Sequence, residues 1–214
     1  MPERTVPERA LKDRLREEYF DLLPDIRRVA RHLETEIRHR LLPISGRLDK
    51  YEQITVEARI KVCESALDKV LREEEGRTFD QTKTQTLRDL KDLAGVRVLV
   101  FPRSHLDEID LALQPIFEVP TADPILGDGG ERLALKYWCY CPQASSEIPG
   151  EYQIVPMLTR LFWTVEHSAI YKPSPRLKDA VRAPGIRLLR QKVLEALGAF
   201  EEEFERLVRE ESSL

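Results

Sequence analysis

Two neighbouring stretches, RIKVCESALDK at residues 59–69 and DLAGVRVLVF at residues 92–101, contain the residues on which the fold and the site depend. In the first stretch, Lys61, Ser65 and Lys69 are spaced four apart, so a helix places them on one face. Arg59 reaches toward that face from the preceding turn. The opposite face is apolar and is predicted to pack against a core through Val62, Cys63, Ala66, Leu67, Val70 and Leu71.

The chemistry of these residues suits a nucleotide. Lysine ammonium groups, a planar guanidinium and a small hydroxyl together bind polyphosphates well. Asp92, which precedes the apolar run 95–101, is an acid of the kind that binds a metal ion. Taken alone, the spacing of four is more typical of a solvated helix surface, so the weight of this interpretation comes from the order of the motifs that follow.

Composition narrows the class of protein. The chain has 214 residues, which predicts one domain spanning 1–214 with helical N- and C-terminal extensions. Charged residues make up 34% of the chain but the net charge is −4, which disfavours nonspecific duplex binding and permits a local basic pocket. No stretch reaches the ~20 apolar residues of a membrane span, and no signal peptide is recognisable. Three cysteines, two of them on one side of a predicted strand, indicate reduced thiols in the cytoplasm.

The pattern of apolar residues predicts a mixture of helices and strands. Predicted helices cover 8–42, 56–75, 105–114, 157–172 and 185–211, with an interruption near Pro24. Predicted strands cover 95–101, 133–141 and 151–155, and a polar loop holding Pro142, Pro149 and Gly150 separates the last two. A polar surface loop is expected at 77–88. The result is an α+β domain in which helices flank a small mixed sheet.

A second acid, Glu151, begins the last predicted strand. Alternation places Glu151 and Gln153 on one face of this strand, with Tyr152 and Ile154 on the other. If this strand neighbours 95–101, Asp92 and Glu151 could hold one Mg²⁺ between them. The alternative is a strand-end glutamate that is only solvated. Glu166 and His167 could likewise form an acid/base or metal pair, although a structural hydrogen bond is the preferred interpretation of His167.

These motifs resemble the synthetase domain of the RelA/SpoT family, and the resemblance covers about residues 15–205. It is carried by Arg59/Lys61/Ser65/Lys69, by Asp92-Leu93-Ala94-Gly95-Val96-Arg97 and by Glu151-Tyr152-Gln153, with weaker support from Phe162-Trp163-Thr164-Val165-Glu166-His167 and Tyr171-Lys172. The size is that of the small alarmone synthetases, including their toxic members. The resemblance implies the nucleotidyltransferase-like synthetase fold and an ATP pyrophosphokinase of the stringent response, making guanosine tetra- and pentaphosphate (ppGpp and pppGpp).

The resemblance also implies a role for each matching residue. Arg59 and Arg97 would sandwich the adenine of ATP between their guanidinium planes. Lys61, Ser65 and Lys69 would hold the triphosphate. Asp92 and Glu151 would bind Mg²⁺, and Glu151 would help to deprotonate the attacking 3′-hydroxyl.

The chain departs from the family on the acceptor side. The family's Gly-Tyr-x-x-x-His loop aligns with Glu131-Arg132-Leu133-Ala134-Leu135-Lys136, so Arg132 replaces the stacking tyrosine and Lys136 the histidine. The Arg-Thr that usually follows Glu-x-Gln is Val155-Pro156. Two added cations suit a phosphate-rich acceptor, either a guanosine nucleotide or the 3′ end of tRNA, with Gln153 nearby. One of Tyr137, Trp138 and Tyr140 could replace the missing stacking residue, and the others are expected in the core.

Three hypotheses follow from the sequence. The first is a Mg²⁺-dependent pyrophosphokinase that uses ATP and one of these acceptors, and the second is a catalytically inactive nucleotide-binding regulator. The third is an assembly protein built on its charged terminal helices, which the intact Asp92 and Glu151 disfavour. A homo-oligomer and a monomer are both compatible with the stripe at 186–208. No hydrolase motif is present, so a separate hydrolase, an antitoxin or a regulatory partner would be needed to oppose the activity.

Overall fold

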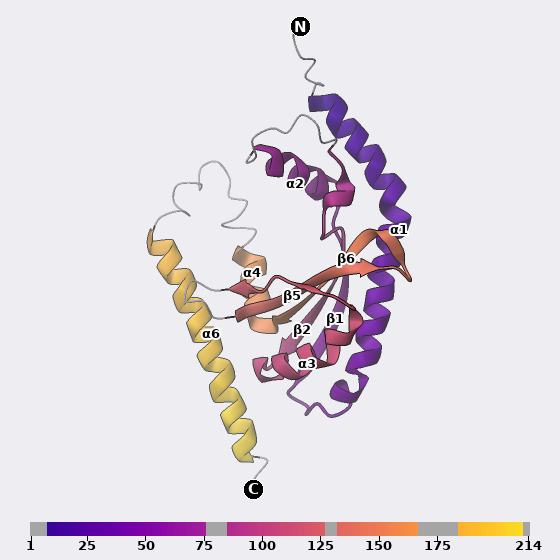
Figure 1. Ribbon diagram of the computed structural model, residues 1–214. Coiled ribbons are helices and arrows are strands. Elements are labelled where there is room, and N and C mark those ends of the chain that lie inside the picture. Colours follow the sequence, from indigo (N-terminus) through magenta and orange to yellow (C-terminus); the bar gives the residue numbers. More distant parts are fainter. Residues whose placement is uncertain (1–7, 76–84, 127–131, 167–183, 212–214) are drawn as a thin grey trace.

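The computed structural model describes residues 8–75, 85–126, 132–166 and 184–211, with a mixed sheet between α1 on one side and α4 and α6 on the other (Figure 1). The strand order is β1-β2-β6-β5-β3, and β4 pairs with β5. The strands are β1 (Gln53–Ile60), β2 (Ala94–Phe101), β3 (Thr121–Ala122), β4 (Ile125–Leu126), β5 (Arg132–Cys141) and β6 (Ser145–Pro156). The helices are α1 (Glu8–Ser45), α2 (Cys63–Glu75), α3 (Leu106–Leu113), α4 (Met157–Glu166) and α6 (Pro184–Glu211). The predicted α+β class is confirmed.

The hydrophobic core lies between α1 and one face of the sheet. α1 packs against β1, β2 and β6 and has a fully buried stripe at helical spacing. The stripe consists of Leu15, Ile26, Val29, Leu33 and Ile37. This stripe faces alternate buried residues of two strands. They include Val96 and Val98 of β2 and Tyr152 and Ile154 of β6. The opposite face of the sheet is therefore free to hold polar residues.

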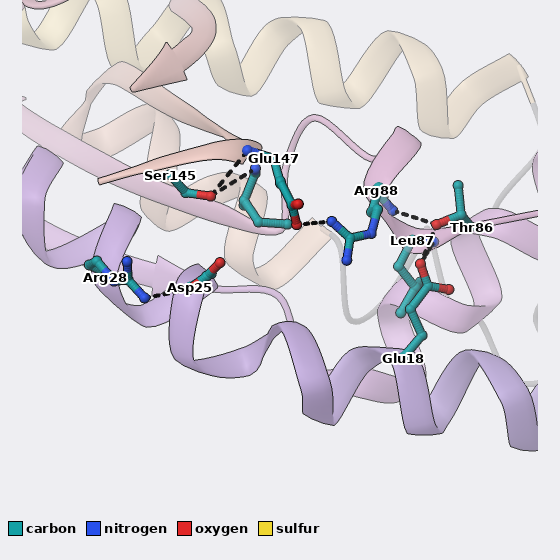
Figure 2. Close-up of polar contacts among 9 residues, drawn as sticks. Glu18, Asp25, Arg28, Thr86, Leu87, Arg88, Ser145 and Glu147 are labelled. Atoms are coloured by element: carbon teal, nitrogen blue, oxygen red, sulfur yellow. Dashed lines mark hydrogen bonds and ion pairs between the residues drawn. The ribbon is translucent and has the colours of Figure 1, made fainter. Parts of the chain in front are cut away.

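The segment before β2 is bound to α1 and to the first part of β6, as Figure 2 shows. The carboxylate of Glu18 accepts hydrogen bonds from the Thr86 hydroxyl and from the Leu87 backbone nitrogen, the latter at 3.2 Å. Arg88 forms an ion pair with Glu147 in the first part of β6. These contacts fix the chain just upstream of Asp92.

The predicted helix over 56–75 was wrong in its first part. Residues 53–60 form β1, which pairs antiparallel with β2, and the helix begins only at Cys63. The β-branched residues of β1 favour a strand, and the spacing of four in the site motif resembled helical periodicity by coincidence. Ala66, Leu67 and Val70 are buried as predicted, but Val62 lies before the helix and is 63% exposed.

Pro24 does not interrupt α1, which also contains Pro43. A proline inside a helix costs about 3 kcal/mol, whereas each fully buried aliphatic side chain contributes about 1.5–3 kcal/mol. The buried stripe of α1 therefore outweighs the cost of Pro24. In the same way, Pro149 and Gly150 lie within β6, not in a loop, and the β5–β6 turn is confined to 142–144. β2 pairs with β6 only from Gly150 onward, so Pro149 is at a sheet edge, where proline is tolerated.

The other predicted elements agree with the structure within their described parts. The strand at 95–101 and the helices at 105–114 and 185–211 are confirmed as β2, α3 and α6. The helix predicted at 157–172 is confirmed to Glu166, and the remainder lies outside the described residues. Most of the predicted loop at 77–88 also lies outside them. The three cysteines are free thiols, and no helix among the described residues has the length and apolarity needed to cross a bilayer.

The C-terminal helix carries a buried carboxylate. α6 packs on the sheet through Phe204, whose ring centroid lies 5.3 Å from that of Phe101. One turn earlier, Glu201 is only 2% exposed, and its Oε1 has no hydrogen-bond partner among the described residues. Burial raises the pKa of Glu201 to about 7, an effect that the charge of Arg103 opposes and that of Glu205 reinforces. Ionised Glu201 therefore weakens the docking of α6.

Glu201→Gln is expected to stabilise the fold at high pH. Because the folded-state pKa is raised, the contribution of Glu201 to stability is complete below pH ~4.5 and is lost as the pH rises through about 7. The variant should therefore gain roughly 1–3 kcal/mol in free energy of unfolding at pH 8 and little at pH 5. Urea unfolding at both values measures this, with the exposed neighbour Glu202→Gln as control. An equal effect at both pH values would refute the assignment.

Candidate active site

Polar side chains line the sheet face that is turned away from α1, and the strand register arranges them in two rows. One row crosses the sheet from Arg59 through Gly95 and Glu151 to Trp138. The next row contains Glu57, Arg97, Gln153 and Lys136. Residues directly opposite each other on paired strands project from the same face. The sheet thus brings together residues from four strands that are up to 96 positions apart in the sequence, between Glu57 and Gln153.

At the end of the first row, two lysines meet Asp92. Lys61 follows β1 directly, and its backbone nitrogen donates to the Leu93 carbonyl oxygen at 3.0 Å. Its Nζ lies 2.8 Å from Oδ2 of Asp92, and Nζ of Lys69, from α2, lies 3.1 Å from Oδ1. Burial alone would raise the pKa of Asp92, but the hydrogen bond and charge of Lys61, together with Lys69, hold it below its usual range. Asp92 is therefore ionised at neutral pH.

Ser65 lies in the first turn of α2, one turn before Lys69 and on the same helix side. Its side chain is half-buried. The lysine, serine and lysine predicted to act together thus come from two elements, a strand end and a helix, that meet at Asp92. The sequence placed all three on a single helix, which is correct only for Ser65 and Lys69.

Glu151 is 7% exposed and is held from one side by Gln153. The Gln153 Nε2 donates to Oε1 of Glu151 at 2.7 Å, and Nη2 of Arg97 donates to Oε1 of Gln153 at 3.5 Å. Burial raises the pKa of Glu151; the charge of Lys136 opposes this, and the charge of Asp92 adds to it. The two acids therefore lie close enough to interact. Glu151 lies in β6 and Asp92 lies two residues before β2, and these two strands are the parallel neighbours that a shared metal ion requires.

Gly95 lets β2 and β6 lie close together beneath the site. A Cβ at this position would lie 3.0 Å from the Glu151 carbonyl oxygen and 3.7 Å from the Glu151 Cβ. The first distance is shorter than ordinary van der Waals contact, so a larger residue would push β2 and β6 apart beneath the two acids. Glycine at this position therefore preserves the spacing between Asp92 and Glu151.

Arginines gather where α4 crosses β2. Burial, together with the neighbouring charges of Arg160 and Arg59, lowers the pKa of Arg97 to about 10. Clustered guanidinium groups suit an anion or an aromatic ring system. Arg160 was not predicted from the sequence. The sequence feature that could have indicated it is that Arg160 is the only cation in the otherwise mainly apolar α4.

The candidate acceptor residues do not all reach this face. Lys136 does, beside Gln153, and it forms an ion pair with Asp123. Tyr137 points to the core face, where its ring centroid lies 5.1 Å from that of Tyr152. The structure therefore does not bring Tyr137 to the site.

Arg132 lies four residues from Lys136 along β5, or about 14 Å at the rise of a strand. Its Nη2 is 3.5 Å from Oδ1 of Asp107 on α3. It borders a hollow of about 390 Å³ that also contacts Arg103, Ser104 and Glu205. The two added cations thus mark two separate places on β5. Glu166 forms an ion pair with Arg190 of α6, and His167 lies outside the described residues.

The donor set fits a magnesium ion that is shared with a nucleotide. No group of three or more His, Cys, Asp or Glu suited to a metal occurs within the described part of the chain. Mg²⁺ in phosphate-handling sites is commonly held by one or two carboxylates plus substrate phosphates. Asp92 and Glu151 supply two such carboxylates, and the lysines beside Asp92 can turn to the phosphates.

Comparisons with known proteins place this fold. No protein-family model and no curated protein matches the chain. Among solved structures, the small alarmone synthetase 1 from Bacillus subtilis is 18% identical with a TM-score of 0.63, covering 92% of this chain and 100% of that one. Structures of that enzyme bound to AMPCPP and to its product pppGpp give TM-scores of 0.61 and 0.59 at 16% and 20% identity. Each covers 92% of this chain, and 99% and 100% of its own. The chain has the fold of the small alarmone synthetases.

Proposed function

We propose that this protein is a Mg²⁺-dependent ATP pyrophosphokinase that acts on the 3′-hydroxyl of a nucleotide or of tRNA. The observation that carries the proposal is the meeting of Lys61, Lys69 and Asp92 beside the buried Glu151, on a fold shared with alarmone synthetases. Cations for the phosphates and two acids for the metal are what this transfer requires.

In the proposed reaction, the 3′-oxygen of the acceptor attacks the β-phosphorus of ATP. The bond from this phosphorus to the oxygen bridging it to the α-phosphorus breaks, so AMP leaves and pyrophosphate is transferred. Lys61, Ser65 and Lys69 hold the triphosphate, and Arg59 and Arg97 hold the adenine. Glu151, aligned by Gln153, accepts the proton of the 3′-hydroxyl. Mg²⁺ bound by Asp92 and Glu151 would neutralise charge on the phosphates.

Two observations bear on the acceptor. Lys136 lies on the site face beside Gln153, close enough to Glu151 to lower its pKa, so it can contact an acceptor phosphate. The related fold bound to pppGpp supports a guanosine nucleotide. Arg132, about 14 Å further along β5, would contact only an acceptor long enough to span that distance, such as an RNA end. A guanosine nucleotide and tRNA are therefore the two acceptors proposed.

The test incubates γ-labelled ATP and Mg²⁺ with GDP, GTP, ADP or deacylated tRNA in parallel reactions. The formation of AMP and the molecule that receives the label are both measured. Label on GDP or GTP identifies an alarmone synthetase, and label on tRNA identifies an enzyme that blocks translation. If ATP binds but no AMP forms with any of these acceptors, the enzyme proposal is overturned and a nucleotide-binding regulator is favoured. A reaction with EDTA in place of Mg²⁺ is the control.

A further inference from the structure

The strand register distinguishes three aromatic residues of β5 that the sequence could not rank. Tyr137 pairs with the buried Tyr152 and faces the core. Trp138 pairs with Glu151, so its ring projects from the site face next to the proposed base. Tyr140 alternates to the same face as Trp138 but pairs with Pro149, one row beyond Glu151. Trp138 is thus the aromatic residue of this set nearest to the reacting groups.

The ring of Trp138 is open to approach from outside the core. Nζ of Lys91 lies over it, 4.0 Å from the ring centroid. Lys91 is exposed, and an ammonium group keeps water around it, so this ring face is not packed against apolar side chains. Lys91 also immediately precedes Asp92, and Trp138 pairs with Glu151, so this cation and ring lie beside the two acids of the site.

We propose that Trp138 is the stacking residue for the acceptor, on which the nucleobase lies while its 3′-hydroxyl faces Glu151. This inference rests on the proposed function and specifies its acceptor: an unpaired nucleoside with a phosphate on its 5′ side, free or at an RNA end. On binding, Lys91 leaves the ring and pairs with that phosphate, so the cation and the ring exchange partners within one subsite. An indole accepts any base, because every base has a π face.

The sequence departures in the acceptor loop agree with this assignment. Arg132, one of the two cations in the candidate acceptor segment, lies about 20 Å from Trp138 along β5. It is paired with Asp107, away from Glu151. Trp138, in contrast, lies directly opposite Glu151 on the paired strand.

Fluorescence tests the contact directly. In a Trp163→Phe background the emission comes from Trp138 alone, since the chain has two tryptophans. GDP, ADP and deacylated tRNA are titrated separately, with ribose 5-phosphate as a probe that lacks a base. Saturable quenching by base-bearing probes only is expected, and the probe that quenches at the lowest concentration distinguishes a free nucleotide from an RNA end. Binding detected by calorimetry without quenching would overturn the proposal.

Kinetics provide a second readout. Base stacking contributes about 1–3 kcal/mol, so Trp138→Ala should raise the acceptor KM roughly 5- to 150-fold and leave the KM for ATP within about twofold. Trp138→Phe should recover most of the affinity, which separates stacking from a loss of folding. Tyr140→Ala, on the same face, is the matched control and should have no effect. An unchanged acceptor KM in Trp138→Ala, or an equal rise in Tyr140→Ala, would refute the assignment.

The two proposals fail in different ways. Transfer by the wild-type protein without quenching would refute the role of Trp138 and leave the pyrophosphokinase in place. Quenching by base-bearing probes without transfer to any acceptor would refute the enzyme and support Trp138 as a base-binding residue.

Discussion

Asp92→Asn is expected to reduce the rate of pyrophosphate transfer at least ~1,000-fold, because a metal ligand contributes several kcal/mol to stabilising the transition state. It should also lower the free energy of unfolding at pH 7 by about 1–3 kcal/mol. Oδ2 of Asp92 accepts a hydrogen bond from Nζ of Lys61 at 2.8 Å, and its Oδ1 lies 3.1 Å from Nζ of Lys69. An asparagine removes the carboxylate charge that both partly buried lysines face in this fold. AMP release and urea unfolding measure the two effects.

Asp68→Asn is the matched control, because it makes the same chemical change at an exposed position next to Lys69. It should preserve both activity and stability. Since the pKa of Asp92 is lowered in the fold, its contribution to stability is present above its ordinary pKa and disappears as the pH falls. Full activity in Asp92→Asn would contradict the metal assignment, and unchanged stability would contradict the ion pairs.

Glu151→Gln is expected to reduce transfer by roughly 100- to 10,000-fold through loss of the general base. Its effect on stability should be opposite to that of Asp92→Asn. Burial raises the pKa of Glu151, so the ionised carboxylate opposes folding, and this cost grows as the pH rises above the ordinary carboxyl range. The amide removes the charge, and the free energy of unfolding at pH 8 should rise. Parallel denaturant titrations of the two variants reveal the contrast.

Glu202→Gln, the same chemical change at an exposed position of α6, provides the comparison for Glu151→Gln and should preserve both transfer and stability. ATP affinity should remain within a few-fold in Glu151→Gln, because the lysines and arginines that hold the nucleotide are unchanged. A variant that transfers pyrophosphate at the wild-type rate would exclude Glu151 as the base. Destabilisation at pH 8 would contradict its raised pKa.

The sequence predicted residues that the structure brings close together, but it assigned part of their local structure wrongly. The shared magnesium site of Asp92 and Glu151 required the strands at 95–101 and 151–155 to be neighbours, and β2 and β6 do pair in parallel. The helix assigned to 56–75 was wrong because Arg59, Lys61, Ser65 and Lys69 fit a period of four while spanning a strand, a bend and a helix. Spacing alone does not distinguish these arrangements.

Other features depend on tertiary structure and left little signal in the sequence. Trp138 and Tyr137 are adjacent, and only the register with β6 shows which faces Glu151 and which faces the core. Arg160 approaches Arg97 because α4 folds back over β2. The burial of Glu201 depends on how α6 packs beside Arg103, and the helical pattern of α6 alone does not indicate it.

Positional labelling of ATP tests the central claim most directly. The protein is incubated with Mg²⁺ and the acceptor that gives most AMP, using ATP labelled in turn at the α-, β- and γ-phosphorus. A pyrophosphokinase transfers both the β- and γ-label to the acceptor and leaves the α-label in AMP. Transfer of the γ-label alone with formation of ADP, transfer of the α-label with release of pyrophosphate, or no transfer to any acceptor would contradict the account.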